Sequence, residues 1–182
     1  MKTTIRARLS GVVVFLALLS IIAGLLGLYG MSSANDELKS VYEDRTVALE
    51  QVSRIESLLL ANRLALAQAL LDPIASNIKA QSDLIEKNAK EITKTWGDYM
   101  ATRLTPEESV LAEKFAVDKT KMMKEGLFPA IDALRGGKFE DAKQLQEQFQ
   151  TLLPATTEGV DALRKLQVDE AKKAYDLSLI HI

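Results

Sequence analysis

From Met31 to about residue 177, apolar side chains recur at steps of three and four residues, which is the spacing of one face of an α-helix. No stretch of this part alternates apolar and polar residues as a half-buried strand would. The most regular stripe lies in the middle of the chain and consists of Ile74, Ile78, Ile85, Ala89, Ile92, Trp96 and Tyr99. The pattern therefore predicts an all-α chain.

Three short breaks divide the helical pattern. Proline restricts the residue before it, so Asp72-Pro73 should end the first helix. At the second break, Thr105 suits the N-cap position, and Pro106-Glu107-Glu108 suits a first turn because it combines proline with acidic residues. At the third, Arg135-Gly136-Gly137 supplies glycine, which can adopt the left-handed conformation that ends a helix. These breaks predict four helices, at about residues 31–71, 74–103, 106–135 and 138–177.

Helices joined by such short connections pack as antiparallel neighbours, so the simplest fold is an up-down-up-down antiparallel four-helix bundle. Trp96 and Tyr99 are expected in its core, with a place in the lining of a ligand pocket as the alternative. Met122-Met123 should fill core space. Pro129 lies inside the third predicted helix and should kink it or free a backbone carbonyl, because proline has no N–H.

Near the N-terminus the apolar pattern becomes continuous. Residues 9–35 contain no Asp, Glu, Lys or Arg, and a helix across a bilayer needs about 20 apolar residues. We therefore predict a transmembrane helix over residues 11–30 that continues into the first bundle helix. A cleaved signal peptide is the alternative, because Ser32-Ser33-Ala34 offers small residues for cleavage. The apolar region of a signal peptide, however, is only about 7–15 residues long.

Charge sets the expected topology. Lys2, Arg6 and Arg8 precede the apolar run without an acidic residue, and the positive-inside rule places residues 1–10 in the cytoplasm. The rest of the chain then lies outside, where 20 basic and 25 acidic residues give a net charge of −5. The short run from Lys119 to Lys124 is expected to be a solvated basic face, so no nucleic-acid partner is expected.

The sequence lacks the residues that several kinds of catalysis and metal binding require. The absence of Cys excludes disulfides, thiolate metal sites and a cysteine nucleophile. His181 is the only histidine and stands in the last two residues, which disfavours histidine-dependent catalysis and histidine-ligated metals. We therefore expect no enzyme, no metal and no cofactor.

Three stretches, taken with the N-terminal apolar helix, carry a family resemblance. They are VYEDRTVALEQVSRIESLLLANR (41–63), GLFPAIDALRGGKFEDA (126–142) and LRKLQVDEAKKAYD (163–176). In this order and at these spacings they resemble the N-terminal part of bacterial methyl-accepting chemotaxis receptors over residues 1–177. The resemblance implies an inner-membrane protein with a periplasmic four-helix-bundle ligand-binding domain. It also implies a parallel homodimer along the first bundle helix.

A full receptor of that family would continue with a second membrane helix, a HAMP module and a signalling coiled coil. The sequence contains none of these parts, so we expect a chain truncated before its second span. Cytoplasmic kinase and adaptor partners would be reached only through the missing part. Residues 178–182 break the pattern of the last helix and are interpreted as a foreign tail or the approach to that span. The same sensory bundle also precedes histidine kinase and cyclase modules, which leaves the output open.

Candidate ligand contacts follow from the resemblance. In receptors of the aspartate and serine type, arginines on the distal part of the first helix bind a ligand carboxylate across the dimer interface, and a threonine after a proline on the last helix contributes. The predicted ligand-binding residues here are Arg63, Thr156, Thr157 and Arg54. If the second span follows at the family's spacing, the helical rise places Thr156 near the height of Arg63. Ala67 and Asp72 stand where further arginines would strengthen the anion pocket, so amino-acid specificity does not carry over.

Two other arginines receive mainly structural interpretations. Arg45 lies on the apolar stripe of the first bundle helix, where a charge needs a partner. It is predicted to form a structural ion pair with an acidic residue of another helix, with ligand contact as the alternative. Arg135 is a candidate anion contact for which a surface position is preferred.

The resulting hypothesis is a transmembrane chemoreceptor that senses a small carboxylate or amino acid and transmits a helix displacement. The alternative is a membrane-tethered adaptor bundle that recognises a periplasmic protein through an exposed helix face.

Overall fold

The computed structural model describes residues 5–40 and 45–180. Its elements are α1 (Ile5–Ser40), α2 (Val47–Leu71), α3 (Ala75–Met100), α4 (Pro106–Met122), the π-helix η2 (Met123–Leu127), α5 (Phe128–Arg135) and α6 (Phe139–Ile180). Within these described ranges there is no strand, so the prediction of an all-α chain is confirmed.

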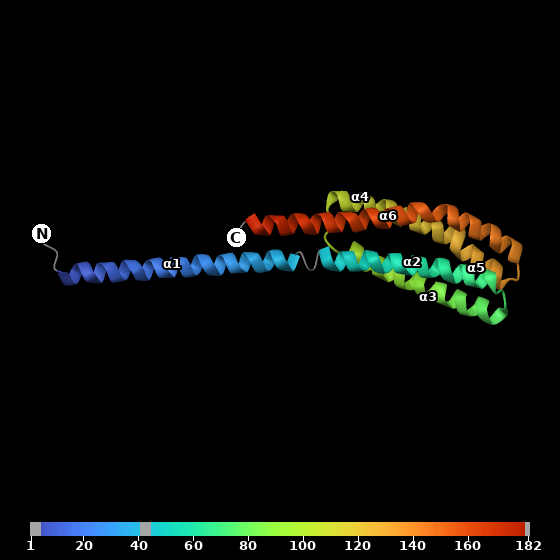
Figure 1. Cartoon of the computed structure of the whole chain (residues 1–182), viewed down its shortest axis with the longest axis horizontal. Coiled ribbons are helices and arrows are strands. Elements are labelled where there is room, and N and C mark those ends of the chain that lie inside the picture. Colours follow the sequence, from blue (N-terminus) through green and yellow to red (C-terminus); the bar gives the residue numbers. More distant parts are fainter. Residues whose placement is uncertain (1–4, 41–44, 181–182) are drawn as a thin grey trace.

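The bundle consists of four rods, whose course can be followed in Figure 1. The helices α2, α3 and α6 are three of them, and α4, η2 and α5 follow one another as the fourth. The helix α2 packs against α3 and α6, the rod α4–η2–α5 packs against α6, and α5 also contacts α3. The α2–α3 and α5–α6 connections lie at the far end of the bundle, and α1 leads away from the opposite end, here called the α1 end. The antiparallel four-helix bundle is thereby confirmed.

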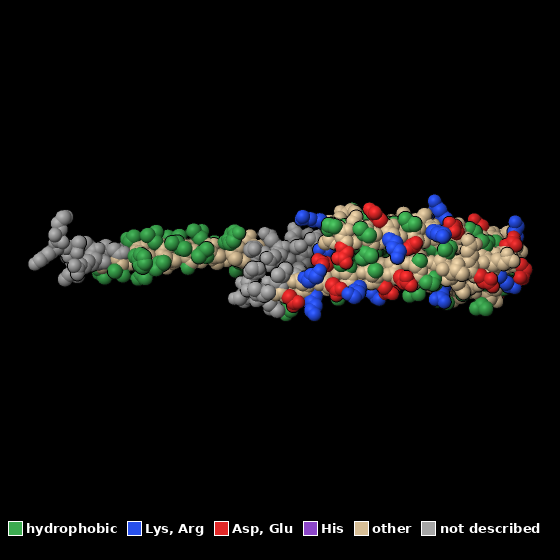
Figure 2. Space-filling model, turned by 90° about the horizontal axis from the view of Figure 1, so that it is seen from above, with side chains coloured by type: hydrophobic (Ala, Val, Ile, Leu, Met, Phe, Trp, Pro, Cys, Tyr) green, Lys and Arg blue, Asp and Glu red, His purple; other side chains and the backbone are tan. Residues whose placement is uncertain are grey.

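The helix α1 contains the apolar segment. Val12–Ser32 has 21 residues with a mean hydropathy of 2.7, and in the described part of the chain it is the one helix long and apolar enough to cross a membrane. Its side chains are exposed along the whole segment, and Figure 2 shows them as an apolar rod beside a bundle of mixed charge. The predicted continuation of this helix into the bundle falls on residues 41–44, which lie outside the described residues, as do residues 1–4.

The helix ends follow the local chemistry of the three breaks. The helix α2 ends at Leu71, before Asp72-Pro73. A capping box starts α4, because Thr105 accepts a hydrogen bond from the N–H of Glu108 while the Glu108 side chain accepts one from the N–H of Thr105. After α5, Gly137 adopts a φ of 71°, the left-handed conformation expected at this break.

The rod α4–η2–α5 changes its winding before Pro129. The N–H of Phe128 bonds to the carbonyl of Met123, which is the five-residue step of a π-helix. Because Pro129 has no N–H, it cannot give the carbonyl of Glu125 its ordinary α-helical partner, and the wide turn accommodates this loss. Within the same turn, a Cβ added to Gly126 would lie 2.7 Å from the Cα of Phe149, so the turn brings its backbone directly against α6.

The last helix is longer than predicted. The helix α6 continues to Ile180 and contains Pro154 in its interior. The last two residues of the chain lie outside the described range.

Candidate ligand-binding site

The outward face of α2 carries a regular series of small and apolar residues. They are Ser53, Ser57, Leu60, Leu64, Ala67 and Leu71, spaced alternately by four and three residues, and we call them the α2 stripe. Leu64, for example, is 59% exposed, whereas the opposite face of α2 is buried in the core. Alternating steps of three and four are the pattern of a coiled-coil seam. The α2 stripe is therefore a helix surface with the spacing that a second helix would need.

Arg63 lies beside this stripe, next to Leu64 and one helical turn from Leu60 and Ala67. Its side chain is exposed and, among the described residues, forms no hydrogen bond or ion pair. The Nε of Arg54, by contrast, donates to Glu91 over 2.7 Å, so this predicted ligand residue already has a carboxylate partner. Of the arginines whose side chains are described, Arg63 and Arg103 have no acidic partner. Arg63 is thus an available guanidinium on the α2 face.

The predicted threonine partners face a different way. Thr156 is fully buried, and its hydroxyl donates to the carbonyl of Leu152 over 3.5 Å. Thr157 is half-buried and donates to the carbonyls of Leu153 and Pro154 over 3.1 and 2.9 Å. Arg63 points out of the bundle and Thr156 into it, so the structure does not bring this predicted pair together within one chain.

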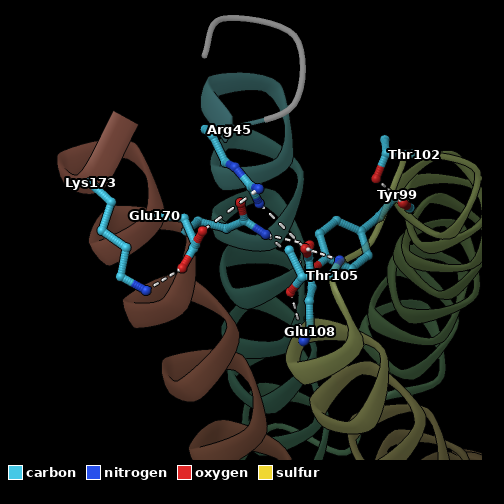
Figure 3. Close-up of polar contacts among 8 residues, drawn as sticks. Arg45, Tyr99, Thr102, Thr105, Glu108, Glu170 and Lys173 are labelled. Atoms are coloured by element: carbon cyan, nitrogen blue, oxygen red, sulfur yellow. Dashed lines mark hydrogen bonds and ion pairs between the residues drawn. The ribbon is translucent and has the colours of Figure 1, made fainter. Parts of the chain in front are cut away.

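At the α1 end, a carboxylate lies inside the bundle. Glu108 is 1% exposed and accepts a hydrogen bond from the hydroxyl of Tyr99 over 2.6 Å (Figure 3). It also accepts one from the side-chain amide of Gln167. Burial raises the pKa of Tyr99, and the hydrogen bond to Glu108 raises it further. Tyr99 is therefore a core residue held by a buried acceptor, as its core interpretation required.

Arg45 completes this group of side chains. Its Nη1 lies 3.5 Å from Oε2 of Glu108, and its Nη2 lies 3.9 Å from Oε2 of Glu170. Glu170 also pairs with Lys173 over 2.6 Å. Arg45 thus forms an ion pair with acidic residues of two other helices. We call Arg45, Tyr99, Glu108, Gln167 and Glu170 the proximal cluster.

Next to the cluster, Trp96 stacks on Tyr99 with ring centroids 5.1 Å apart and packs against Phe115 at 4.8 Å. The ammonium of Lys119 lies 5.3 Å from the centre of the Trp96 ring. Lys119 is only 8% exposed, and burial lowers its pKa. The expectation of a solvated basic face from Lys119 to Lys124 was therefore wrong at Lys119, because its side chain turns toward α3, although Lys121 and Lys124 are exposed.

Two hollows lie elsewhere on the bundle. One of about 300 Å³ at the far end is lined by Pro73, Ala75, Ile78, Lys79, Leu134, Arg135, Gly137 and Phe139. Arg135 is bound there to Glu86 over 2.5 Å and lies 3.6 Å from Asp83. A second hollow of about 440 Å³ lies between α3 and the η2–α5 region. In the described part of the chain, no group of acidic side chains could hold a metal ion.

Residues 1–171 match the family model described as Tar ligand binding domain homologue. This chain belongs to that family. The methyl-accepting chemotaxis protein NahY of Pseudomonas putida is 25% identical over 179 residues, which are 97% of this chain and 33% of the relative. The chain thus spans about a third of that curated relative's length. No solved structure matches.

The Tar-homologue family supports a chemotaxis sensor role, and the resemblance to methyl-accepting chemotaxis receptors is confirmed. Sensor domains of this family are generally not enzymes, and the apolar α1 is consistent with a membrane protein. Two features of this Tar homologue were not predicted from the sequence, namely the α2 stripe and the role of Glu108 as a buried hydrogen-bond acceptor. The alternating steps of the stripe are visible in the sequence, whereas only packing reveals that the capping residue Glu108 is also a buried acceptor.

Proposed function

We propose that the chain is the sensor region of a transmembrane chemoreceptor that binds a small carboxylate, such as an organic or amino acid. Residues 1–10 are cytoplasmic, residues 11–30 form the anchor, and residues 31–177 form the sensor in the periplasm. The Tar-homologue match and the apolar helix α1 support this arrangement. The similarity to a methyl-accepting chemotaxis protein favours chemotaxis over a histidine kinase or cyclase output.

The observation that carries the ligand class is Arg63, an exposed guanidinium without an acidic partner in the described structure. We propose that two copies pair along the α2 stripe, which places Arg63 of each chain at the edge of the seam. A guanidinium can hold a carboxylate through two hydrogen bonds. The ligand then binds across the dimer, and the half-buried Thr157 replaces the buried Thr156 as the candidate second contact.

Signal transmission requires that the ligand bind two conformations with different affinity. The helix α2 follows the membrane anchor in the chain, and α6 runs back along the bundle to the α1 end (Figure 1). A ligand at the α2 face therefore biases a small displacement of α6 against α2, which is passed to a cytoplasmic signalling module.

The test is a thermal-shift screen of the membrane-embedded chain with a panel of small carboxylates, amino acids and uncharged solutes. Titration calorimetry with the best compound then compares Arg63→Ala with Arg103→Ala, a matched control because Arg103 is also exposed and has no acidic partner in the described structure. We expect Arg63→Ala to cost about 1.5–3 kcal/mol of binding, the range for hydrogen bonds to charged groups, and the control to cost nothing measurable. Equal affinity in both variants would remove Arg63 from the site.

The α2 stripe also supports the alternative of a membrane-tethered adaptor, because an exposed apolar helix face can receive another protein. That function predicts that no compound of the panel shifts the melting temperature. It also predicts that Leu64→Glu abolishes capture of a periplasmic protein without affecting a ligand.

A further inference from the structure

The proximal cluster connects all four rods of the bundle at one level. Arg45 precedes α2, Tyr99 belongs to α3, Glu108 lies in the first turn of α4, and Glu170 belongs to α6 (Figure 3). Gln167 also belongs to α6. The buried carboxylate of Glu108 is the common acceptor of this group. Toward the C-terminus of α6 the described side chains become half-buried or exposed beyond Gln167, so the cluster forms the last polar layer of the bundle at the α1 end.

The cluster contacts α6 through two residues, one a hydrogen-bond donor and the other an acidic side chain. Gln167 of α6 donates to Glu108, whereas Glu170 of α6 is the acidic partner of Arg45. These two residues are three positions apart, so they face the same side of α6 on successive turns. N–H···O hydrogen bonds in proteins have donor–acceptor distances of about 2.7–3.2 Å. An axial shift of α6 by even a fraction of a turn therefore breaks the Gln167–Glu108 hydrogen bond, and it changes the separation of Arg45 and Glu170, which is 3.9 Å in this register.

The layer is not arranged for stability alone. The Oε1 atom of Gln167 is buried without a hydrogen-bond partner, and the buried carboxylate of Glu108 forms an ion pair with Arg45 alone among the described residues. Replacing a whole buried ion pair by apolar residues of similar volume is often neutral for stability, whereas removing one partner is destabilising, and the best-attested role of such buried groups is to specify register. The arrangement of these side chains fits a layer that fixes one position of α6.

We propose that the proximal cluster is an axial lock, which holds α6 in one register against α2 and α4 until a signal displaces it. The lock rests on the proposed function in one respect, namely that displacement of α6 is the transmitted signal. Glu108 and Gln167 form its buried half, and Arg45 and Glu170 form its solvent-facing half.

The register of α6 can be measured by disulfide cross-linking, because the chain has no cysteine of its own. The measurement needs no ligand. In the membrane-embedded chain, Glu56→Cys on α2 is combined in turn with Asp161→Cys, Arg164→Cys and Val168→Cys on α6. Glu56 pairs with Arg164 over 3.3 Å in the structure, and the three α6 positions are exposed or half-exposed on one face of the helix. Oxidation rates of the three pairs then give the register profile.

The profile is measured in the wild-type background and in two lock variants, Gln167→Leu and Glu108→Gln, the second of which keeps the size of the side chain. The matched control is Gln150→Leu, an exposed glutamine of the same helix. We expect the 56–164 pair to oxidise fastest in the wild type and in the control. In both lock variants, the rates of the 161 and 168 pairs relative to the 164 pair should rise by about fivefold or more, the lower end of typical coupling effects.

An unchanged profile in both lock variants, with helical content retained, would overturn the lock and leave the cluster a purely structural element. If Gln167→Leu does not fold, the more conservative Glu108→Gln decides by itself. Because no ligand is used, the result is independent of the carboxylate screen. A failed screen with a shifted profile contradicts the proposed ligand, and a successful screen with an unchanged profile contradicts the lock.

Discussion

Gly126 and Gly97 both lie inside helices, but their surroundings are opposite. A Cβ on Gly126 would meet the backbone of Phe149 at 2.7 Å, whereas a Cβ on Gly97 would meet nothing within 4 Å. We expect Gly126→Ala to lower the free energy of unfolding by about 1–3 kcal/mol, because neither backbone can move away without cost. Gly97→Ala should raise it by about 0.5–1 kcal/mol, since alanine favours the helix. Urea unfolding followed by circular dichroism measures both, and a stabilising Gly126→Ala would contradict the close contact between η2 and α6.

Lys119 gives stability a dependence on pH. Burial lowers its pKa in the folded state below the ordinary value of 10.5, so on raising the pH the folded chain loses this proton before the unfolded chain does. Between the two pKa values the unfolded chain binds more protons, and stability rises with pH. Relative to Lys119→Met, the wild type should therefore gain stability as the pH is raised toward 10.5, the ordinary pKa of lysine.

The matched control for this experiment is Lys121→Met, because Lys121 is exposed on the same helix. Its difference from the wild type should stay constant over the same pH range. Denaturant titrations at several pH values give both differences, and two parallel curves would show that the burial of Lys119 has no electrostatic consequence.

The environment of a single residue was predictable from the sequence where helical phase alone decides it. Arg45 lies in phase with a core stripe, so its need for a partner could be predicted, although the choice of Glu108 and Glu170 depends on packing. Thr156 also lies on a core stripe, and the structure buries it. Matching its height with that of Arg63 did not bring the two together, because height fixes position along the bundle and not direction around each helix.

At the level of the helix, the start of α4 depends on the hydroxyl of Thr105, which accepts the N–H of Glu108 over 3.2 Å. Thr105→Ala should lower the free energy of unfolding by about 1 kcal/mol, the typical cost of a lost N-cap. Thr120→Ala is the control, since Thr120 is exposed on the same helix and bonds only to the carbonyl of Ala116. We expect a change within about 0.5 kcal/mol for the control. Equal effects in urea unfolding would show that the cap contributes nothing specific.

The helix boundaries were predictable where a residue type changes the backbone. Proline after Asp72, threonine and proline at 105–106, and glycine after Arg135 all stand at breaks that the structure contains. The π-helical turn was not predictable in detail. Pro129 predicts an irregular turn, but whether the helix kinks or forms a π-helical turn depends on the packing of α6 against Gly126.

At the scale of the whole molecule, the α2 stripe predicts which faces meet in an assembly. Leu64 on α2 and Val117 on α4 are exposed to similar degrees, 59% and 66%, but only Leu64 belongs to a regular seam. In membranes, oxidation of Leu64→Cys should trap the majority of the chain as covalent dimers, whereas Val117→Cys should remain at the background level. Trapping at both positions alike would indicate random collisions, and trapping at Val117→Cys alone would place the interface on another face.

The position of the single tryptophan gives the molecule a spectroscopic property. Trp96 stacks on Tyr99, whose hydroxyl is bound to Glu108, and it lies beneath the ammonium of Lys119. Its indole is therefore in contact with Tyr99, whose hydroxyl also accepts a hydrogen bond from Gln167 of α6. Since the chain has no other tryptophan, the wavelength and intensity of its emission report on this one place. A rearrangement of the α1 end of the bundle can thus be followed in real time by native fluorescence, without a label.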